Sequence, residues 1–185
     1  MTETMSPALE VTADELDYVQ IDDCLIDQAV QALNAVRREG FKLAVAESCT
    51  GGLIATVLSE APGAAEHFEG GYIVYTAEQK TCALKISPTL IERCGTVSAE
   101  VAMAMAEGVL KNSNADVAVA VTGVAGPEAD EKGNPIGRVY FGCARRGRRT
   151  FHRKVEFGDL GRSLVRREAA MKAMALVVNC VHSRE

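Results

Sequence analysis

The sequence predicts an α/β fold: a three-layer α/β/α sandwich around a mixed, mostly parallel sheet. Segments with helical and extended patterns alternate along the chain, as they do when helices cover both faces of a sheet. A continuous, valine-rich apolar run at 116–121 has the length and composition of a fully buried strand. Two strand-like segments near the C-terminus are joined by a short basic turn, and this hairpin must add antiparallel strands.

The elements of the first half follow from apolar spacing and from capping residues. Asp22 and Asp23 offer an N-cap for the first helix, and Gly40 ends it. A strand that bends at Gly70 and Gly71 is expected before the middle of the chain. The expected elements are a helix at 23–39, a strand at 42–46, a helix at 50–59, a helical turn at 64–67 and a strand at 68–76.

The second half contains three further helices before its first strand. Ser87 and Pro88 open one helix and Ser98 caps the next, since each residue suits the start of a helix. The expected elements are helices at 77–84, 89–94 and 99–112, a strand at 116–121, an exposed loop at 128–134, strands at 137–145 and 150–157, and a final helix that runs from about Ser163 towards His182.

The composition fits one folded domain. The 185 residues are 48% hydrophobic, which is enough for a substantial core, although only 5% are aromatic and none is tryptophan. Residues 22–185 are interpreted as a single domain, and residues 1–21 as an acidic N-terminal extension. The net charge of −5 argues against nucleic acid as a partner.

The remaining compositional signals bear on location and on metals. No apolar stretch is long enough to cross a membrane, and the N-terminus lacks the features of a signal peptide, so a cytoplasmic location is expected. The six cysteines are scattered without a Cys-x-x-Cys pair, which favours free thiols over a disulfide framework or a zinc site.

One stretch concentrates reactive side chains at a predicted strand-to-helix turn. Residues 45–52 are Val-Ala-Glu-Ser-Cys-Thr-Gly-Gly. Ser48 and Cys49 lie where backbone N–H groups and the positive end of the helix dipole favour an oxyanion or a phosphate. An ordinary helix cap explains the same residues, with Ser48 or Thr50 as N-cap and the glycines easing the turn.

Two other loops also begin where a predicted strand ends. Ligands of open α/β sheets bind beyond the carboxyl ends of the strands. If the loops 47–52, 76–80 and 122–127 converge, one pocket is lined by four polar side chains: Ser48, Tyr75, Lys80 and Thr122.

The residue types favour a serine–lysine pair over a histidine triad. His67, His152 and His182 all lie outside the three loops. Lys80 is a candidate base if burial lowers its pKa, and Tyr75 could then orient the proton. The competing interpretation makes Lys80 a lysine on a helix surface, since lysines are mostly exposed.

Further candidates remain open at this point. Cys49 is a rival nucleophile, because a helix N-terminus acidifies a thiol. The small residues Gly123, Ala125 and Gly126 permit close approach of a ligand, or they form only a tight turn. Three arginines near the start of the last helix suit a phosphate or a carboxylate, or they form a solvated face: Arg162, Arg166 and Arg167.

Taken together, these motifs resemble the CinA C-terminal-domain family. The resemblance rests on Ala46-Glu47-Ser48-Cys49-Thr50-Gly51-Gly52, on the spacing of Tyr75 and Lys80, on Gly95-x-Val97-Ser98, on Thr122-Gly123-x-Ala125-Gly126-Pro127 and on Phe157-Gly158-Asp159 followed by arginines. It covers roughly residues 26–181.

The resemblance implies an amidohydrolase that converts nicotinamide mononucleotide to nicotinate mononucleotide and ammonia. It assigns the nucleophile to Ser48, the base to Lys80 and an assisting role to Tyr75, with no metal or other cofactor. The binding residues that it implies are Cys49, Thr50, Gly51 and Gly52 after the nucleophile, Thr122, Gly123, Ala125 and Gly126 in the matching loop, and an arginine at Arg162 or Arg166.

The resemblance also implies a homodimer or larger homo-oligomer, in the form that lacks the additional N-terminal domain of longer CinA proteins. The alternatives are a non-catalytic competence or damage-inducible binding protein of the same fold, and a Ser/Lys amidase for another small amide.

Overall fold

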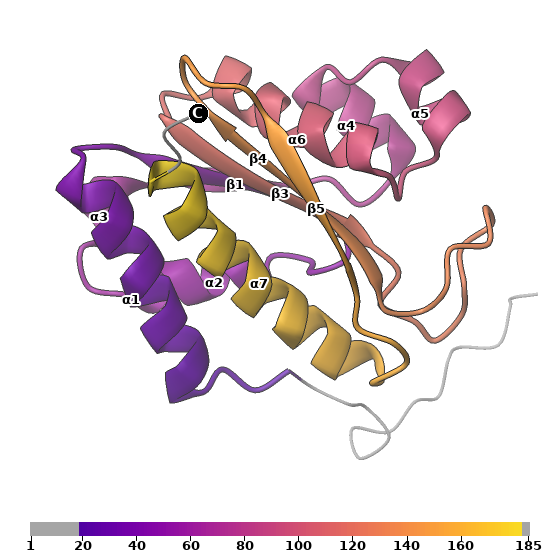
Figure 1. Cartoon of the computed structure of the whole chain (residues 1–185), viewed down its shortest axis with the longest axis horizontal. Helices are drawn as coiled ribbons and strands as arrows, with labels where there is room; N and C mark the ends of the chain where they lie inside the picture. Colours follow the sequence, from indigo (N-terminus) through magenta and orange to yellow (C-terminus); the bar gives the residue numbers. More distant parts are fainter. Residues whose placement is uncertain (1–18, 183–185) are drawn as a thin grey trace, which may run out of the picture.

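A five-stranded mixed sheet forms the middle layer of the molecule, as the computed structural model of residues 19–182 shows (Figure 1). The strand order is β2-β1-β3-β4-β5. Strand β1 pairs in parallel with β2 and β3, whereas β4 is antiparallel to both β3 and β5. The strands are β1 (Leu43–Glu47), β2 (Phe68–Ile73), β3 (Val117–Gly123), β4 (Arg138–Arg145) and β5 (Phe151–Glu156).

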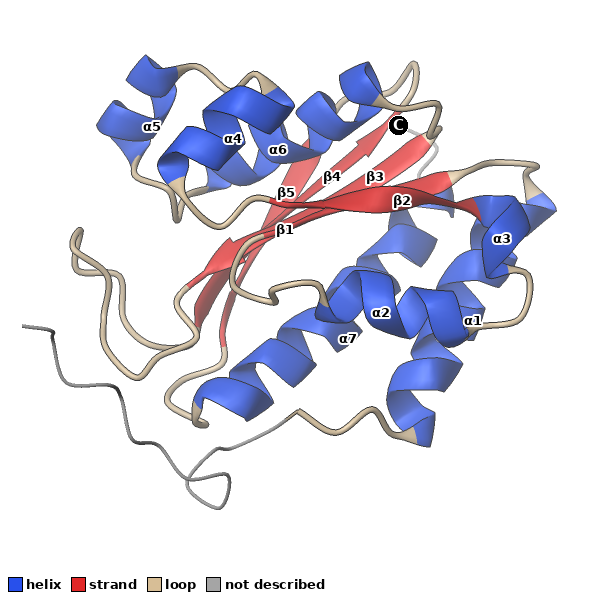
Figure 2. Cartoon of the chain, turned by 180° about the vertical axis from the view of Figure 1, so that it is seen from behind, coloured by secondary structure: helices blue, strands red, loops and turns tan. Residues whose placement is uncertain are grey.

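Helices cover both faces of this sheet (Figure 2). One layer contains α1 (Asp23–Arg38), α2 (Leu53–Glu60), α3 (Ala64–His67) and α7 (Arg162–His182). The other contains α4 (Ala77–Leu84), α5 (Pro88–Cys94) and α6 (Ala99–Asn112). The predicted three-layer sandwich with a mixed, mostly parallel sheet is therefore confirmed. No helix within the described residues is long and apolar enough to cross a membrane.

Side-chain size separates the two faces of the central strands. The valines of β3 at 117, 119 and 121 pack into the core beneath α1, α2 and α7. Ala118 and Ala120 face the second core, beneath α4 and α6. The helix α6 approaches this face so closely that a methyl group on Gly142 of β4 would collide with the carbonyl of Ala102. The apolar run at 116–121 thus fills a large core on one side and permits close helix packing on the other.

The predicted bend in the second strand is a local irregularity in its pairing with β1. Leu43 pairs with Phe68 but Ala44 pairs with Gly70, so the chain carries an extra residue, Glu69, just before the two glycines. The side of Gly71 is pressed against Val45, where an added Cβ would lie 2.7 Å from a methyl group. Glycine is required here because the strands approach each other closely.

The connections place a topological switch point at the carboxyl ends of β1 and β3. The chain leaves β1 through α2 and α3 to reach β2, and it returns from β2 through α4, α5 and α6 to β3 on the other side of β1. These crossings use opposite faces of the sheet (Figure 2). Such a switch point opens a crevice that holds the ligand in many α/β proteins.

Candidate functional site

The helix α2 is capped by Glu47, not by Ser48 or Thr50. Its N-cap residue, Gly52, has a φ of 97° and no capping side chain. The fully buried carboxylate of Glu47 instead accepts hydrogen bonds from the backbone N–H groups of three residues: Gly52 at 3.0 Å, Ile54 at 3.1 Å and Ala55 at 2.8 Å. The interpretation of Ser48 or Thr50 as an N-cap was therefore wrong, and the hydroxyl of Ser48 is free for another partner.

Lys80 is that partner. Its side chain is 0% exposed, and its Nζ atom lies 3.0 Å from the Oγ atom of Ser48. The same amine donates to the carbonyl of Val74 at 2.7 Å and to that of Tyr75 at 3.3 Å. Thr76 caps α4, and Lys80 lies in the first turn of this helix. The interpretation of Lys80 as a surface lysine was therefore wrong.

Burial changes the protonation of this lysine. Removal of the charged ammonium from water lowers the pKa of Lys80 from 10.5 to about 8. At this pKa roughly a tenth of the amine is neutral at pH 7 and half of it at pH 8. A neutral amine within hydrogen-bond distance of a serine hydroxyl can accept its proton, and this is the requirement for a serine–lysine nucleophile.

Ser48 lies at a cavity of about 220 Å³ that two of the three predicted loops line, 47–52 and 122–127, together with Tyr75 and Arg162 of α7. The predicted loop 76–80 does not line it. Lys80 lies behind Ser48 and does not line the cavity. The residues that do are Ser48, Cys49, Tyr75, Thr96, Val97, Thr122, Gly123, Val124, Ala125, Gly126, Glu128, Asp130 and Arg162. Four of the predicted binding residues lie outside this lining: Thr50, Gly51, Gly52 and Arg166.

The structure separates the two candidate arginines. Arg162 lines the cavity, where its guanidinium donates to the carbonyl of Gly126 at 2.7 Å and to the hydroxyl of Tyr75 at 3.1 Å. Arg166 is half-buried and lies behind the loop 48–52, where it donates to the carbonyl of Thr50 at 3.0 Å. The third arginine, Arg167, pairs with Asp22 at 2.6 Å and so ties α7 to the start of α1.

Tyr75 and Thr122 also have specific partners. The Tyr75 side chain is 57% exposed and its phenol contacts Arg162, whereas Lys80 contacts only its backbone carbonyl. The hydroxyl of Thr122 lines the cavity and donates to the carbonyl of Thr96 at 2.8 Å. Thr122 can therefore offer a ligand only the remaining acceptor capacity of its oxygen.

Cys49 does not have the acidic thiol that its position suggested. Its side chain is buried, and this burial raises its pKa to about 12. The nearby charge of Glu47 acts in the same direction. A thiol that stays protonated at neutral pH is a poor nucleophile, so Ser48 is the stronger candidate.

Backbone donors for an oxyanion are confined to the first part of the loop. The N–H of Gly51 donates to the carbonyl of Ser48 at 3.1 Å, and that of Gly52 is held by Glu47. Those of Cys49 and Thr50 donate to no other backbone group among the described residues. These two N–H groups follow the nucleophile directly, where an oxyanion hole would be needed.

Sequence reasoning missed several residues of this site. Glu47 is the most informative, since an acidic residue at the end of an otherwise apolar strand was a visible signal of a buried role. Thr96 and Val97 come from the segment before α6, and Glu128 and Asp130 come from the predicted exposed loop. Within residues 19–182, no group of three or more His, Cys, Asp or Glu side chains is placed to hold a metal ion.

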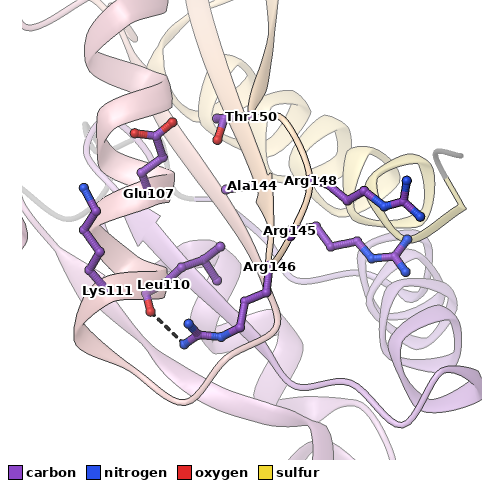
Figure 3. Close-up of a pocket in the computed structure, with 9 residues that line it drawn as sticks. Glu107, Leu110, Lys111, Ala144, Arg145, Arg146, Arg148 and Thr150 are labelled. Atoms are coloured by element: carbon purple, nitrogen blue, oxygen red, sulfur yellow. Dashed lines mark hydrogen bonds between the residues drawn. The ribbon is translucent and has the colours of Figure 1, made fainter. Parts of the chain in front are cut away.

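A second groove, of about 390 Å³, lies between α6 and the β4–β5 turn (Figure 3). Two of its basic side chains, Arg145 and Arg146, are committed to the fold. Arg146 donates to the carbonyls of Leu110, Ser113 and Ala115, which end α6 and the segment after it. Arg145 donates to the carbonyl of Val181, and both Arg145 and Arg148 point away from Lys111 (Figure 3).

The fold and the site define an α/β protein with a buried serine–lysine pair at the switch point of its sheet. The family described as "CinA C-terminal domain" matches residues 26–181. The chain belongs to this family, which confirms the resemblance found in the sequence.

Relatives and solved structures agree with this assignment. The chain is 41% identical to a CinA-like protein of Synechocystis over 160 residues, which are 86% of this chain and 38% of that protein. It is 40% identical to a putative competence-damage inducible protein of Caldicellulosiruptor saccharolyticus, covering 83% of this chain and 36% of the relative. The chain thus spans less than two fifths of the length of these relatives.

The solved structures match almost along their full length. The competence/damage inducible protein CihA from Agrobacterium tumefaciens superposes with a TM-score of 0.83 at 31% identity, covering 87% of this chain and 98% of the other. A competence-damaged protein (CinA) superfamily protein from Escherichia coli gives a TM-score of 0.80 at 30% identity, covering 88% and 95%.

Proposed function

We propose that this chain is an amidohydrolase that converts nicotinamide mononucleotide to nicotinate mononucleotide and ammonia. The observation that carries the proposal is the 3.0 Å contact between the Lys80 amine and the Ser48 hydroxyl. Burial supports it, because it lowers the pKa of Lys80 to about 8 and thereby supplies a neutral base.

In the first half of the proposed reaction, neutral Lys80 takes the proton of Ser48 as its Oγ atom attacks the carboxamide carbon. The backbone N–H groups of Cys49 and Thr50 stabilise the oxyanion that develops. The ammonium of Lys80 gives the proton to the amide nitrogen as the carbon–nitrogen bond breaks, and this nitrogen departs as ammonia. The product of this half-reaction is an acyl ester on Ser48.

In the second half, a water molecule attacks the ester carbonyl while neutral Lys80 accepts a proton from it. The bond between the acyl carbon and Ser48 breaks, and Lys80 returns the proton to the serine oxygen. The acid product leaves and the free enzyme is restored. One water is consumed and one ammonia is released per turnover, so the step balances without any other reactant.

The position and contacts of Arg162 favour a substrate that carries a phosphate. Arg162 lies at the cavity, and its hydrogen-bond partners among residues 19–182 are uncharged: the carbonyl of Gly126 and the hydroxyl of Tyr75. A guanidinium in this state is suited to a phosphate, with which it forms paired, charge-assisted hydrogen bonds. A substrate that is a metabolite of pyridine-nucleotide salvage is also consistent with the expected cytoplasmic location.

The test is ammonia release from nicotinamide mononucleotide by purified wild type, Ser48→Ala and Lys80→Met. We expect turnover in the wild type, with and without a chelator, and a loss of at least about a thousandfold in either variant. Lys111→Met, at an exposed position on α6, is the matched control and should retain full activity. Full activity in Ser48→Ala or Lys80→Met would exclude the assigned roles.

The same assay separates the alternatives. Absence of ammonia release by the folded wild type would favour the non-catalytic binding protein. Equal turnover of plain nicotinamide and its mononucleotide would favour an amidase for small amides, since the role of Arg162 requires a phosphate.

A further inference from the structure

We propose that Arg162 is a latch across the cavity, formed by its hydrogen bonds to Gly126 and Tyr75. The phosphate of the substrate must bind Arg162 and break these two hydrogen bonds before Ser48 reacts. The enzyme would then select phosphorylated amides through turnover as well as through affinity. This inference rests on the proposed function and adds to it how the same site recognises its substrate class.

The latch is a bridge between two walls of the cavity. Arg162 is the first residue of α7, and it contacts Gly126 in the loop after β3 at 2.7 Å and Tyr75, just beyond β2, at 3.1 Å. All three residues line the cavity that contains Ser48. With the bridge in place, the cavity of about 220 Å³ is smaller than most small-molecule pockets, which span roughly 300–1,000 Å³. The bridge therefore narrows the space that a nucleotide would enter.

The bonds of the latch are weaker than those that a phosphate would offer. A carbonyl and a phenol are neutral acceptors, whereas hydrogen bonds from a guanidinium to phosphate oxygens are about twice as strong. Asp130 also lines the cavity, but its carboxylate accepts hydrogen bonds from Asn134 and from the backbone N–H of Lys132 within its own loop. Arg162 is exposed, so it can change partners without movement of the core.

Tyr75 connects the latch to the catalytic pair. Its phenol is held by Arg162, while its backbone carbonyl lies 3.3 Å from the Lys80 amine. Release of the phenol therefore removes one constraint on the residue whose backbone carbonyl contacts Lys80. Phosphate binding can favour the open state only because Arg162 binds phosphate more strongly than it binds Gly126 and Tyr75. The binding energy of the phosphate then opens the cavity and so lowers the barrier for attack of Ser48 on the carboxamide.

The experiment compares nicotinamide mononucleotide with nicotinamide riboside, which lacks the phosphate, and adds phosphite to the riboside reaction. For the wild type we expect the kcat of the riboside to be at least about tenfold lower than that of the mononucleotide. Saturating phosphite should raise the riboside kcat several-fold, because it opens the latch without being attached to the substrate.

The variant Arg162→Met removes the latch and its phosphate site together. Because the obstruction is gone, we expect its riboside kcat to rise towards that of the mononucleotide and phosphite to have no effect, while the lost phosphate site raises the KM of the mononucleotide. The matched control is Arg149→Met, in the β4–β5 turn at the opposite end of the sheet, which should behave as the wild type does.

The outcomes separate the latch from the proposed function. No turnover of the mononucleotide by the wild type means that the proposed function itself is wrong. If the mononucleotide is turned over but phosphite leaves riboside turnover unchanged, or if the two substrates differ only in KM, the latch is overturned while the proposed function stands.

Discussion

At the scale of single residues, Lys80 shows how burial converts a common cation into a base. The side chain is 0% exposed, and its pKa of about 8 lies well below the ordinary 10.5. Holding the charged form in this place costs on the order of 3 kcal/mol relative to water. Hydrogen bonds with Ser48 and with the carbonyl of Val74 offset part of that cost.

The first prediction concerns the pH dependence of turnover. Only the neutral amine of Lys80 can act as base, so kcat/KM should rise about tenfold per pH unit below pH 8 and level off above it. Ammonia release measured from pH 6 to pH 10 gives this profile. A rate that is independent of pH between 6 and 8 would contradict a role for Lys80 as base.

Stability provides an independent control on the same group. Between pH 8 and 10.5 the unfolded chain carries a proton on Lys80 that the folded chain lacks, so the free energy of unfolding rises with pH in that window. Below pH 8 the stability cost of the buried lysine is fully present. The wild type should gain on the order of 3 kcal/mol relative to Lys80→Met across the window. Urea unfolding at several pH values measures this difference.

Some roles of single residues could be predicted from sequence and others could not. Ser48 and Lys80 follow strand ends, and parallel strands bring such ends together. The orientation of α7 decides between Arg162 and Arg166, which lie one helical turn apart and carry the same chemistry. The orientation of α7 relative to the sheet cannot be predicted from the local sequence. The high pKa of Cys49 was missed because proximity to a helix start is visible in sequence, whereas burial is not.

At the scale of elements, a strand and the next helix are joined by one carboxylate. Glu47 ends β1 and holds three N–H groups of the first turn of α2, so Ser48 lies in a turn that is fixed at both ends. Hydrogen bonds to a charged acceptor are stronger than neutral ones, and a donor left buried without an acceptor is costly.

The second prediction follows for Glu47→Ala. Loss of the shared acceptor should lower the free energy of unfolding by at least about 3 kcal/mol, and the loosened turn should reduce the kcat of ammonia release. Glu47→Gln keeps one acceptor oxygen and should fall between Glu47→Ala and the wild type. Urea unfolding measures these stabilities. The matched control is Glu60→Gln, at the exposed far end of α2, which should unfold as the wild type does. Equal stability of Glu47→Ala and the wild type would show that the cap is unimportant.

The elements themselves were largely predictable, because apolar spacing and capping residues are local signals. The start of α2 was not: a helix from residue 50 was expected, but α2 begins at Leu53. Gly51 and Gly52 have positive φ values of 60° and 97°, so these residues form the turn and not the first turn of the helix. This turn is held by hydrogen bonds from backbone N–H groups to the carboxylate of Glu47, five to eight residues earlier in the chain. Helical spacing in the sequence does not reveal such hydrogen bonds.

At the scale of the whole molecule, the candidate site joins both helical layers. Lys80 belongs to α4 in one layer, Arg162 belongs to α7 in the other, and Ser48 follows the strand between them. A ligand in the cavity therefore contacts parts of the chain that must all be folded together. Binding should be linked to the stability of the entire domain.

The third prediction uses Ser48→Ala, which should bind nicotinamide mononucleotide without consuming it. At a hundredfold excess over Kd the ligand should stabilise the fold by about 3 kcal/mol, which raises the Tm by roughly 5 to 10 °C for a chain of this size. Plain nicotinamide at the same concentration should raise the Tm less, because it lacks the phosphate. Thermal melts with equal shifts for both compounds would contradict a phosphate-binding role for Arg162.

The turn between β4 and β5 has a practical consequence. It contains the exposed residue Gly147, and the pairing of Arg145 with Val117 puts it at the end of the sheet far from Ser48. A fluorescent tag or a tether inserted between Gly147 and Arg148 would leave the entrance to the cavity unobstructed. The protein could thus be immobilised on a sensor surface, with its candidate site facing the solution.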